Sequence, residues 1–103
     1  MRFSYLHGTT KQAARDAIER AIPEFARRAN LQPQDFSQHW EGDTLRGAFH
    51  ARGINVSGTV TVTDTALDIE LRLPMALRPF EGEARRRLTG GLDDIFGPGR
   101  PHA

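Results

Sequence analysis

The chain of 103 residues has no cysteine, and its only lysine, Lys11, stands beside thirteen arginines. Without cysteine there is no disulfide, no thiolate metal site and no thiol nucleophile. No segment approaches the ~20 apolar residues of a membrane-spanning helix. The first ten residues also lack the apolar stretch of a secretion signal. These absences predict a cytoplasmic protein without a transmembrane segment.

An excess of charge of either sign is also missing. Fourteen Lys and Arg residues oppose thirteen Asp and Glu residues, which leaves a net charge of +1. A general nucleic-acid binder needs a marked basic excess, so we predict no nucleic-acid partner. The length is typical of one domain. We expect a single domain over residues 1–97 and a flexible tail over residues 98–103.

Between residues 35 and 73, apolar and polar residues alternate, as they do in strands with one buried face. Three two-residue turns, at Gly42-Asp43, Gly53-Ile54 and Asp64-Thr65, align the apolar residues of four strands on one face. In this register Trp40 lies opposite Leu45, Phe49 opposite Gly58 and Val62 opposite Leu67. The segment therefore predicts an antiparallel meander.

Helical periodicity appears on both sides of the meander. Thr9 or Thr10 is expected to cap a helix that continues through Asn30, and Pro23 within it predicts a kink or a split. Helical spacing of apolar residues appears again from Phe80 to Phe96. Residues 2–7 read as a short first strand. We predict an α+β fold: an antiparallel four- to five-stranded sheet, in the order (β)-α-β-β-β-β-α, with two helices packed on one face.

No catalytic or metal constellation follows from these patterns. His39, Arg46, Thr61 and Asp68 are expected in one row of the polar face, but His39 and Asp68 are then roughly 14 Å apart, too far for a hydrogen bond. Glu41-Gly42-Asp43 is interpreted as a tight turn rather than an acidic site. The histidines lack the spacing of metal ligands, and no nucleophile elbow is present. We predict no enzyme activity, metal or cofactor.

Two groups of residues remain as candidate contact sites. The arginines near the last helix could meet an anionic surface or a partner's carboxylates, although such a run is also typical of a solvated face: Arg78, Arg85, Arg86 and Arg87. Gly47 and Gly58 could open an apolar pocket between sheet and helices, with Gln38 orienting a polar head.

Several motifs resemble those of the polyhydroxyalkanoic acid system proteins, which are described as granule-associated or granule-regulating. The resemblance runs from His7 to Phe96. Its motifs are His39-Trp40-Glu41-Gly42-Asp43 followed by Leu45, Gly53 with Gly58-Thr59-Val60, Leu71-Arg72-Leu73-Pro74, Pro79-Phe80 and Leu92-Asp93-Asp94-Ile95-Phe96. It implies a role at intracellular polyester storage granules and carries no catalytic residue.

The leading hypothesis is therefore a non-enzymatic protein that binds or regulates storage granules or their coat proteins, in the cytoplasm at the granule surface. The alternative is a carrier of a small apolar ligand of the acyl type, held between the sheet and the helices. A homodimer through the Ser/Thr-rich sheet face or an exposed strand edge is a third hypothesis.

Overall fold

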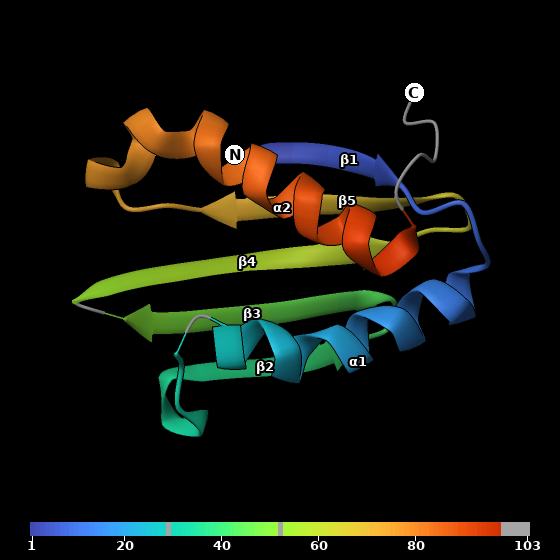
Figure 1. Ribbon diagram of the computed structural model, residues 1–103, viewed down its shortest axis with the longest axis horizontal. Coiled ribbons are helices and arrows are strands. Elements are labelled where there is room, and N and C mark those ends of the chain that lie inside the picture. The colour runs from blue at the N-terminus through green and yellow to red at the C-terminus, as the bar shows by residue number, and fades with distance from the viewer. Residues whose placement is uncertain (29, 52, 98–103) are drawn as a thin grey trace.

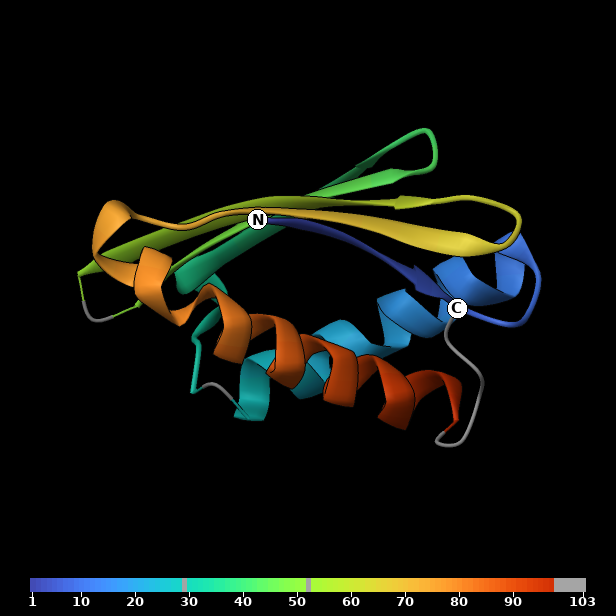
Figure 2. The ribbon, with the colours of Figure 1, turned by 90° about the horizontal axis from the view of Figure 1, so that it is seen from above.

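The computed structural model describes residues 1–28, 30–51 and 53–97, so the predicted tail at 98–103 lies outside the described residues. Five antiparallel strands form one sheet in the order β1-β5-β4-β3-β2, and two helices cover one face of it (Figures 1 and 2). The elements are β1 (Arg2–Leu6), α1 (Lys11–Arg28), η1 (Pro33–Asp35), β2 (Phe36–Glu41), β3 (Thr44–Ala51), β4 (Ile54–Val62), β5 (Ala66–Arg72), η2 (Met75–Phe80) and α2 (Glu81–Phe96). The predicted α+β fold is confirmed, with five strands.

The first and last turns of the meander have the predicted register. Trp40 lies opposite Leu45 and Val62 opposite Leu67. Gly42 takes a φ of +61°, which glycine adopts without the steric cost that a side chain would bring. β1 joins the sheet beside β5, where Phe3 lies opposite Ile69 and Tyr5 opposite Leu67, and so extends the apolar face.

The predicted middle turn at Gly53-Ile54 is wrong by one residue. Ala51 lies opposite Ile54, so Phe49 meets Val56 instead of Gly58, and Gly47 meets Gly58. Gly53, with a φ of +77°, is the second residue of the turn and directly precedes β4. The prediction placed it as the first residue of the turn. Moving a two-residue turn by one position shifts the register by two residues. Because side chains alternate with a period of two, every residue keeps its face.

Both helices run without a break through residues that disfavour helix. The side-chain oxygen of Thr10 accepts a hydrogen bond from the N–H of Ala13, which caps the start of α1. α1 then continues through Pro23, so a split there is wrong. Likewise Gly90 and Gly91 lie inside one continuous α2. Packing on the sheet offsets these local costs.

The apolar layer between sheet and helices is unevenly covered along the strands. At the closed end, where α1 begins and α2 ends, the core contains residues of six elements: Tyr5, Ala14, Ile18, Leu45, Val62, Leu67 and Phe96. At the open end lie the end of α1, η2, the end of β3 and the start of β4, and Figure 1 shows the two helices diverging towards it.

Candidate functional site

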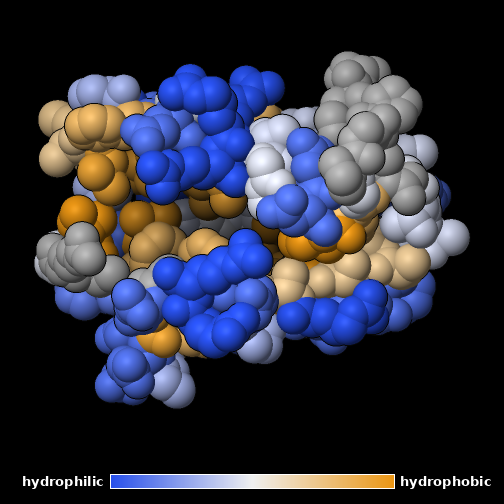
Figure 3. Space-filling model, viewed as in Figure 1, coloured by the Kyte–Doolittle hydropathy of each residue, from blue (hydrophilic) through white to orange (hydrophobic). Residues whose placement is uncertain are grey.

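Exposed apolar side chains are concentrated at the open end. Of the five large hydrophobic residues that are exposed among the described ones, four belong to elements that reach this end: Phe25 at 50%, Ile54 at 36%, Met75 at 79% and Phe80 at 56%. These four residues are called the apolar patch below. Figure 3 shows hydrophobic surface on that side, between the blue surfaces of the helices. Clustered exposure of this kind typically marks an interaction site.

Local structure explains why the apolar patch stays uncovered. Phe25 lies near the end of α1, and its half-exposed ring contacts Phe49 of β3, with the ring centroids 6.2 Å apart. Met75 and Phe80 are the first and last residues of η2, the short helix forced by Pro74 and Pro79. Periodicity alone does not reveal this exposure, because it cannot say which end of a helix stands over the sheet.

The four candidate arginines lie in three different surroundings. Arg85 places its guanidinium 5.2 Å from the centre of the Phe3 ring, and Arg87 donates to the Glu83 carboxylate at 3.0 Å. Arg78 lines a groove of about 510 Å³ with Glu81 and Arg72. No ion pair within the described residues includes Arg78 or Arg86, although both are exposed. Of the four candidate arginines, these two are therefore the ones whose charge is available to an acidic group of a partner.

Gly47 and Gly58 lie opposite each other, but they differ in what surrounds them. A side-chain carbon at Gly58 would lie 2.6 Å from the Glu70 carbonyl oxygen and 2.7 Å from the Leu71 side chain. At Gly47 the nearest atom would be 3.5 Å away. The third residue of the predicted pocket, Gln38, is exposed on β2. The space at Gly58 is thus taken by Leu71 of the neighbouring strand.

On the outer face of the sheet, the predicted row of four residues is wrong in its second half. His39 and Arg46 lie in line with Thr59 and Glu70, whereas Thr61 and Asp68 belong to the next row, with Ser4. The two-residue shift at the middle turn is the cause. His39 and Asp68 therefore lie in separate rows, and Asp68 accepts from Ser4 at 2.7 Å.

A small ionic cluster occupies the β2 end of that face. Arg46 donates from Nε to Glu41 at 2.8 Å, and His39 Nε2 lies 3.0 Å from the other carboxylate oxygen. The hydrogen bond from Arg46, followed by that from His39, holds the pKa of the Glu41 carboxyl below its usual range. All three side chains are exposed. The cluster is a solvated cross-strand pairing.

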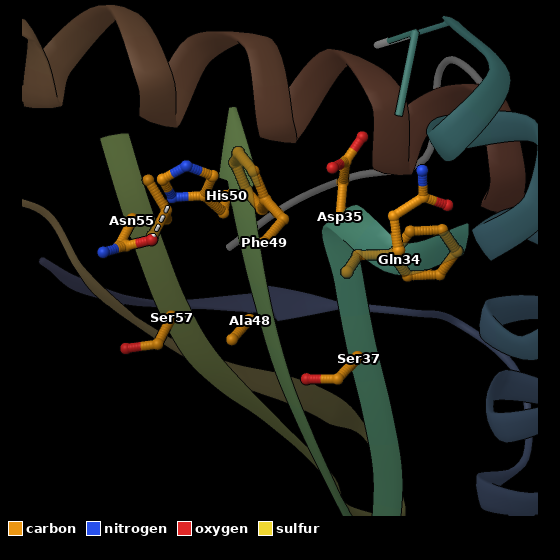
Figure 4. Close-up of a pocket in the computed structure, with 10 residues that line it drawn as sticks. Gln34, Asp35, Ser37, Ala48, Phe49, His50, Asn55 and Ser57 are labelled. Carbon is orange, nitrogen blue, oxygen red and sulfur yellow. Dashed lines mark hydrogen bonds between the residues drawn. The ribbon is translucent and has the colours of Figure 1, made fainter. Parts of the chain in front are cut away.

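Two hollows lie on the outer face. One, of about 310 Å³, is lined by residues at the start of β2 and by the facing parts of β3 and β4, and Figure 4 shows His50 hydrogen-bonded to Asn55 at its rim. The other, of about 560 Å³, has a floor of small residues between Arg46 and Arg72. Every buried side-chain nitrogen or oxygen within the described residues has a hydrogen-bond partner. Neither hollow therefore presents a buried polar group that is left for a ligand.

The turn motif Glu41-Gly42-Asp43 has a contact that sequence reasoning missed. The Asp43 carboxylate accepts from Lys11 at 3.0 Å and from Arg15 at 3.3 Å, both on the first turns of α1. Arg15 also stacks on Trp40, with its guanidinium carbon 4.3 Å from the ring centre. The motif therefore fixes α1 to the β2–β3 hairpin at the closed end, and no local pattern joins residues 28 and 32 positions apart.

Two searches of the described residues found nothing. They contain no group of three or more His, Asp or Glu side chains placed to hold a metal ion. They also contain no helix with the length and apolar character needed to cross a membrane.

Comparison with known proteins gives one match. The family model described as polyhydroxyalkanoic acid system protein matches residues 2–96. No curated protein and no solved structure matches the chain. The match covers every strand and helix of the fold, from the start of β1 to the end of α2.

Proposed function

Because the chain belongs to the family of polyhydroxyalkanoic acid system proteins, we propose that it is a non-enzymatic adaptor that docks on storage granules through its open end. The observation that carries this proposal is the apolar patch, four large side chains exposed by 36% to 79% at one end of the molecule. The family supplies the cellular setting, and the patch supplies a surface that gains free energy when it is covered.

The fold favours docking of the intact molecule over release of a helix. Ala14 and Ile18 of α1 and Phe96 of α2 are buried in the core, so lifting either helix would expose the sheet as well as the helix. Burial of apolar surface contributes roughly 25 cal/mol per Å². The free energy gained by burying a released helix on a granule would therefore be offset by the free energy lost when its surface inside the protein is exposed. Docking through residues that are already exposed carries no such cost.

A protein of the granule coat is the better partner on grounds of charge. Arg78 lies on the same short helix as Met75 and Phe80, and it is exposed without an ion pair among the described residues. Arg27 and Arg28 at the end of α1 share a single carboxylate, Glu24. An apolar patch flanked by cations complements an acidic, apolar protein segment, whereas bare polyester offers no ionised group.

Co-sedimentation with granules tests the proposal. The tagged protein is expressed in a granule-forming cell, and the fraction that pellets with washed granules is measured. Ile54→Ser should lower this fraction several-fold, whereas Ile95→Ser should leave it unchanged. The two isoleucines are matched in exposure, 36% and 37%, but Ile95 lies near the end of α2 and outside the apolar patch. A uniformly soluble wild-type protein under storage conditions would rule the proposal out.

The partner class is tested on the same granules after protease treatment. Loss of binding supports a coat protein, and retained binding means that the polymer itself is contacted. A second pair of variants addresses charge: Arg78→Gln should weaken binding in a salt-dependent way, and Arg87→Gln, already paired with Glu83, should weaken it less.

A further inference from the structure

The free edge of the sheet at β2 has a specific pattern of unpaired backbone groups. The N–H of Val62 donates to the carbonyl oxygen of Asp43 at 2.9 Å, so Asp43 faces β4. Backbone direction alternates along a strand, so Thr44, Arg46 and Ala48 face β2. Their partners on β2 are Glu41, His39 and Ser37. The N–H and C=O groups of Phe36, Gln38 and Trp40 therefore point away from the sheet.

This edge lacks the features by which proteins usually prevent strand pairing. β2 contains no lysine, no proline and no charged residue on its inner face, and its partner β3 pairs with it residue for residue, without a bulge. The opposite edge differs, since Arg85 of α2 packs over Phe3 of β1. The exposed backbone of β2 is thus open to another strand between η1 and the Gly42-Asp43 turn.

We infer that β2 pairs with β2 of a second copy of this chain, antiparallel, about a two-fold axis at Gln38. In that register Gln38 faces Gln38 of the partner, and Phe36 faces the partner's Trp40. All three outward-pointing residues then form hydrogen-bonded pairs at once. Shifting the register by one residue would place apolar side chains against polar ones, and shifting it by two would lose one of the three pairs.

Side-chain chemistry fits the same register. On the inner face the two copies of Gln38 form the central pair. A pair of Phe36 with Trp40 lies on each side of it. Aromatic pairs and amide pairs are both favourable cross-strand neighbours. On the outer face Ser37 meets His39. No like charges are brought opposite each other between residues 36 and 40. The segment from 36 to 40 is therefore complementary to itself in backbone and polarity, while Glu41, which is paired with Arg46, meets Asp35 of the second copy at each end.

Pairing in this way has a consequence for docking, which rests on the proposed function. The two-fold axis is normal to the continuous ten-stranded sheet, so both helix layers lie on the same side of it. The two apolar patches of the dimer then face the same surface. Once one patch has bound, the other is held near the surface at a high effective concentration. A dimer of this kind would bind a granule far more tightly than a monomer does, although each patch alone is small.

Because the chain has no cysteine, single-cysteine variants give a direct test. Gln38 opposes its own copy, with Cα atoms about 5.5 Å apart as in any hydrogen-bonded pair, which is within the range for a disulfide. Purified Gln38→Cys should therefore form a covalent dimer under mild oxidation. His39→Cys is the matched control: it is equally exposed, but its counterpart lies two residues further along the strand, beyond disulfide reach. A mixture of Ser37→Cys and His39→Cys should cross-link between the two variants.

Unmodified protein gives an independent test. Sedimentation equilibrium should show a concentration-dependent dimer, weakened at least tenfold by Gln38→Lys and unaffected by Thr59→Lys in the central strand β4. Amide exchange followed by NMR should show the N–H groups of Phe36, Gln38 and Trp40 becoming protected as the dimer forms. Those of Ser37, His39 and Glu41, which are bonded to β3, should be protected throughout.

Three results would overturn the inference. One is a monomer at every concentration. Another is a dimer in which the amides of Phe36, Gln38 and Trp40 still exchange freely, since a different surface would then be responsible. The third is equal cross-linking of Gln38→Cys and His39→Cys, which random collision would produce. None of these measurements involves granules. A failure of the dimer inference is therefore distinguishable from a failure of the docking proposal, which is tested by co-sedimentation.

Discussion

The closed end and the open end are built from the same two layers, yet the closed end excludes water more completely. Tyr5, Val62 and Leu67 at the closed end are between 0% and 4% exposed, while the apolar patch ranges from 36% to 79%. Polar contacts follow the same division. The hydroxyl of Tyr5 donates to Asp93 at 2.6 Å, which fixes the end of α2 to β1, and Asp43 fixes the start of α1 to the β2–β3 turn.

This difference teaches where stability and where binding reside in a small two-layer fold. Apolar area that is buried inside the molecule contributes to folding, and apolar area left exposed contributes only when a partner covers it. The closed end should therefore respond strongly to truncation of its side chains, and the open end weakly. The following substitutions break or sharpen that comparison.

The largest effect is expected from Leu67→Ala at the closed end. Leu67 is completely buried between β1, β4 and the helices, and its truncation removes apolar contacts and leaves a cavity. The free energy of unfolding should fall by about 3 kcal/mol. Met75→Ala at the open end deletes a side chain of similar size and should change it by less than about 0.5 kcal/mol. Urea titrations of both variants give the comparison, and equal losses would show that the open end is covered in the folded protein.

His7→Ala should rank next, because His7 is the one polar residue buried in the described part of the chain. Its Nε2 lies 2.9 Å from the carbonyl oxygen of Thr63, and its Nδ1 accepts from the N–H of Thr9 at 3.1 Å. With Nδ1 accepting from Thr9, Nε2 is the nitrogen that donates to the Thr63 carbonyl oxygen. Alanine leaves both backbone groups without this partner and should lower stability by about 2 kcal/mol, as measured by thermal unfolding.

The glycine pair gives a matched test of the apolar layer midway between the ends. Gly58→Ala would bring the new carbon within 2.6 Å of the Glu70 carbonyl oxygen, so β5 must shift and stability should fall by about 2 kcal/mol. Gly47→Ala has room, with its nearest neighbour at 3.5 Å, and should be nearly neutral. If Gly58→Ala is as well tolerated as Gly47→Ala, Leu71 moves readily, and space for a small ligand between the two layers becomes credible.

The fate of these two glycines shows what the sequence could and could not predict. Alternation specified which face each residue occupies, and it survived the error at Gly53, because a two-residue shift preserves parity. It could not specify which glycine opposes which, since glycine is acceptable at either position of a tight turn. The exposure of Phe25 also escaped prediction, because periodicity defines the apolar stripe of a helix but not its direction across a sheet.

Candidate contact residues show the same limit. The run Arg85-Arg86-Arg87 is visible in the sequence, but only packing reveals that Arg85 lies against Phe3 and that Arg87 is paired with Glu83. The interpretation of Glu41-Gly42-Asp43 as a turn was right locally. Its link to Lys11 and Arg15 depends on the position of α1, which no short-range signal encodes.

The smallest effect is expected from Asp43→Asn, which tests whether this link helps to keep the closed end shut. The three charged side chains are 27% to 41% exposed, so water screens the pairing and the melting temperature should fall by only a few degrees. The difference from wild type should vanish in about 1 M salt. Asp64→Asn, whose carboxylate lies 3.9 Å from Lys11 and is 90% exposed, is the matched control and should change nothing measurable.

The pH dependence of the Asp43→Asn effect separates the two cations. The hydrogen bond from Lys11 to Asp43 raises the pKa of the Lys11 ammonium. A raised pKa means that its contribution is complete below the unfolded value of about 10.4 and is lost as the pH rises through the folded pKa. A guanidinium group, unlike an ammonium group, is not deprotonated in proteins. The loss of stability caused by Asp43→Asn should therefore become smaller at strongly alkaline pH without disappearing. A loss that does not change with pH would mean that Arg15, with its stacking on Trp40, holds α1 to the hairpin without Lys11.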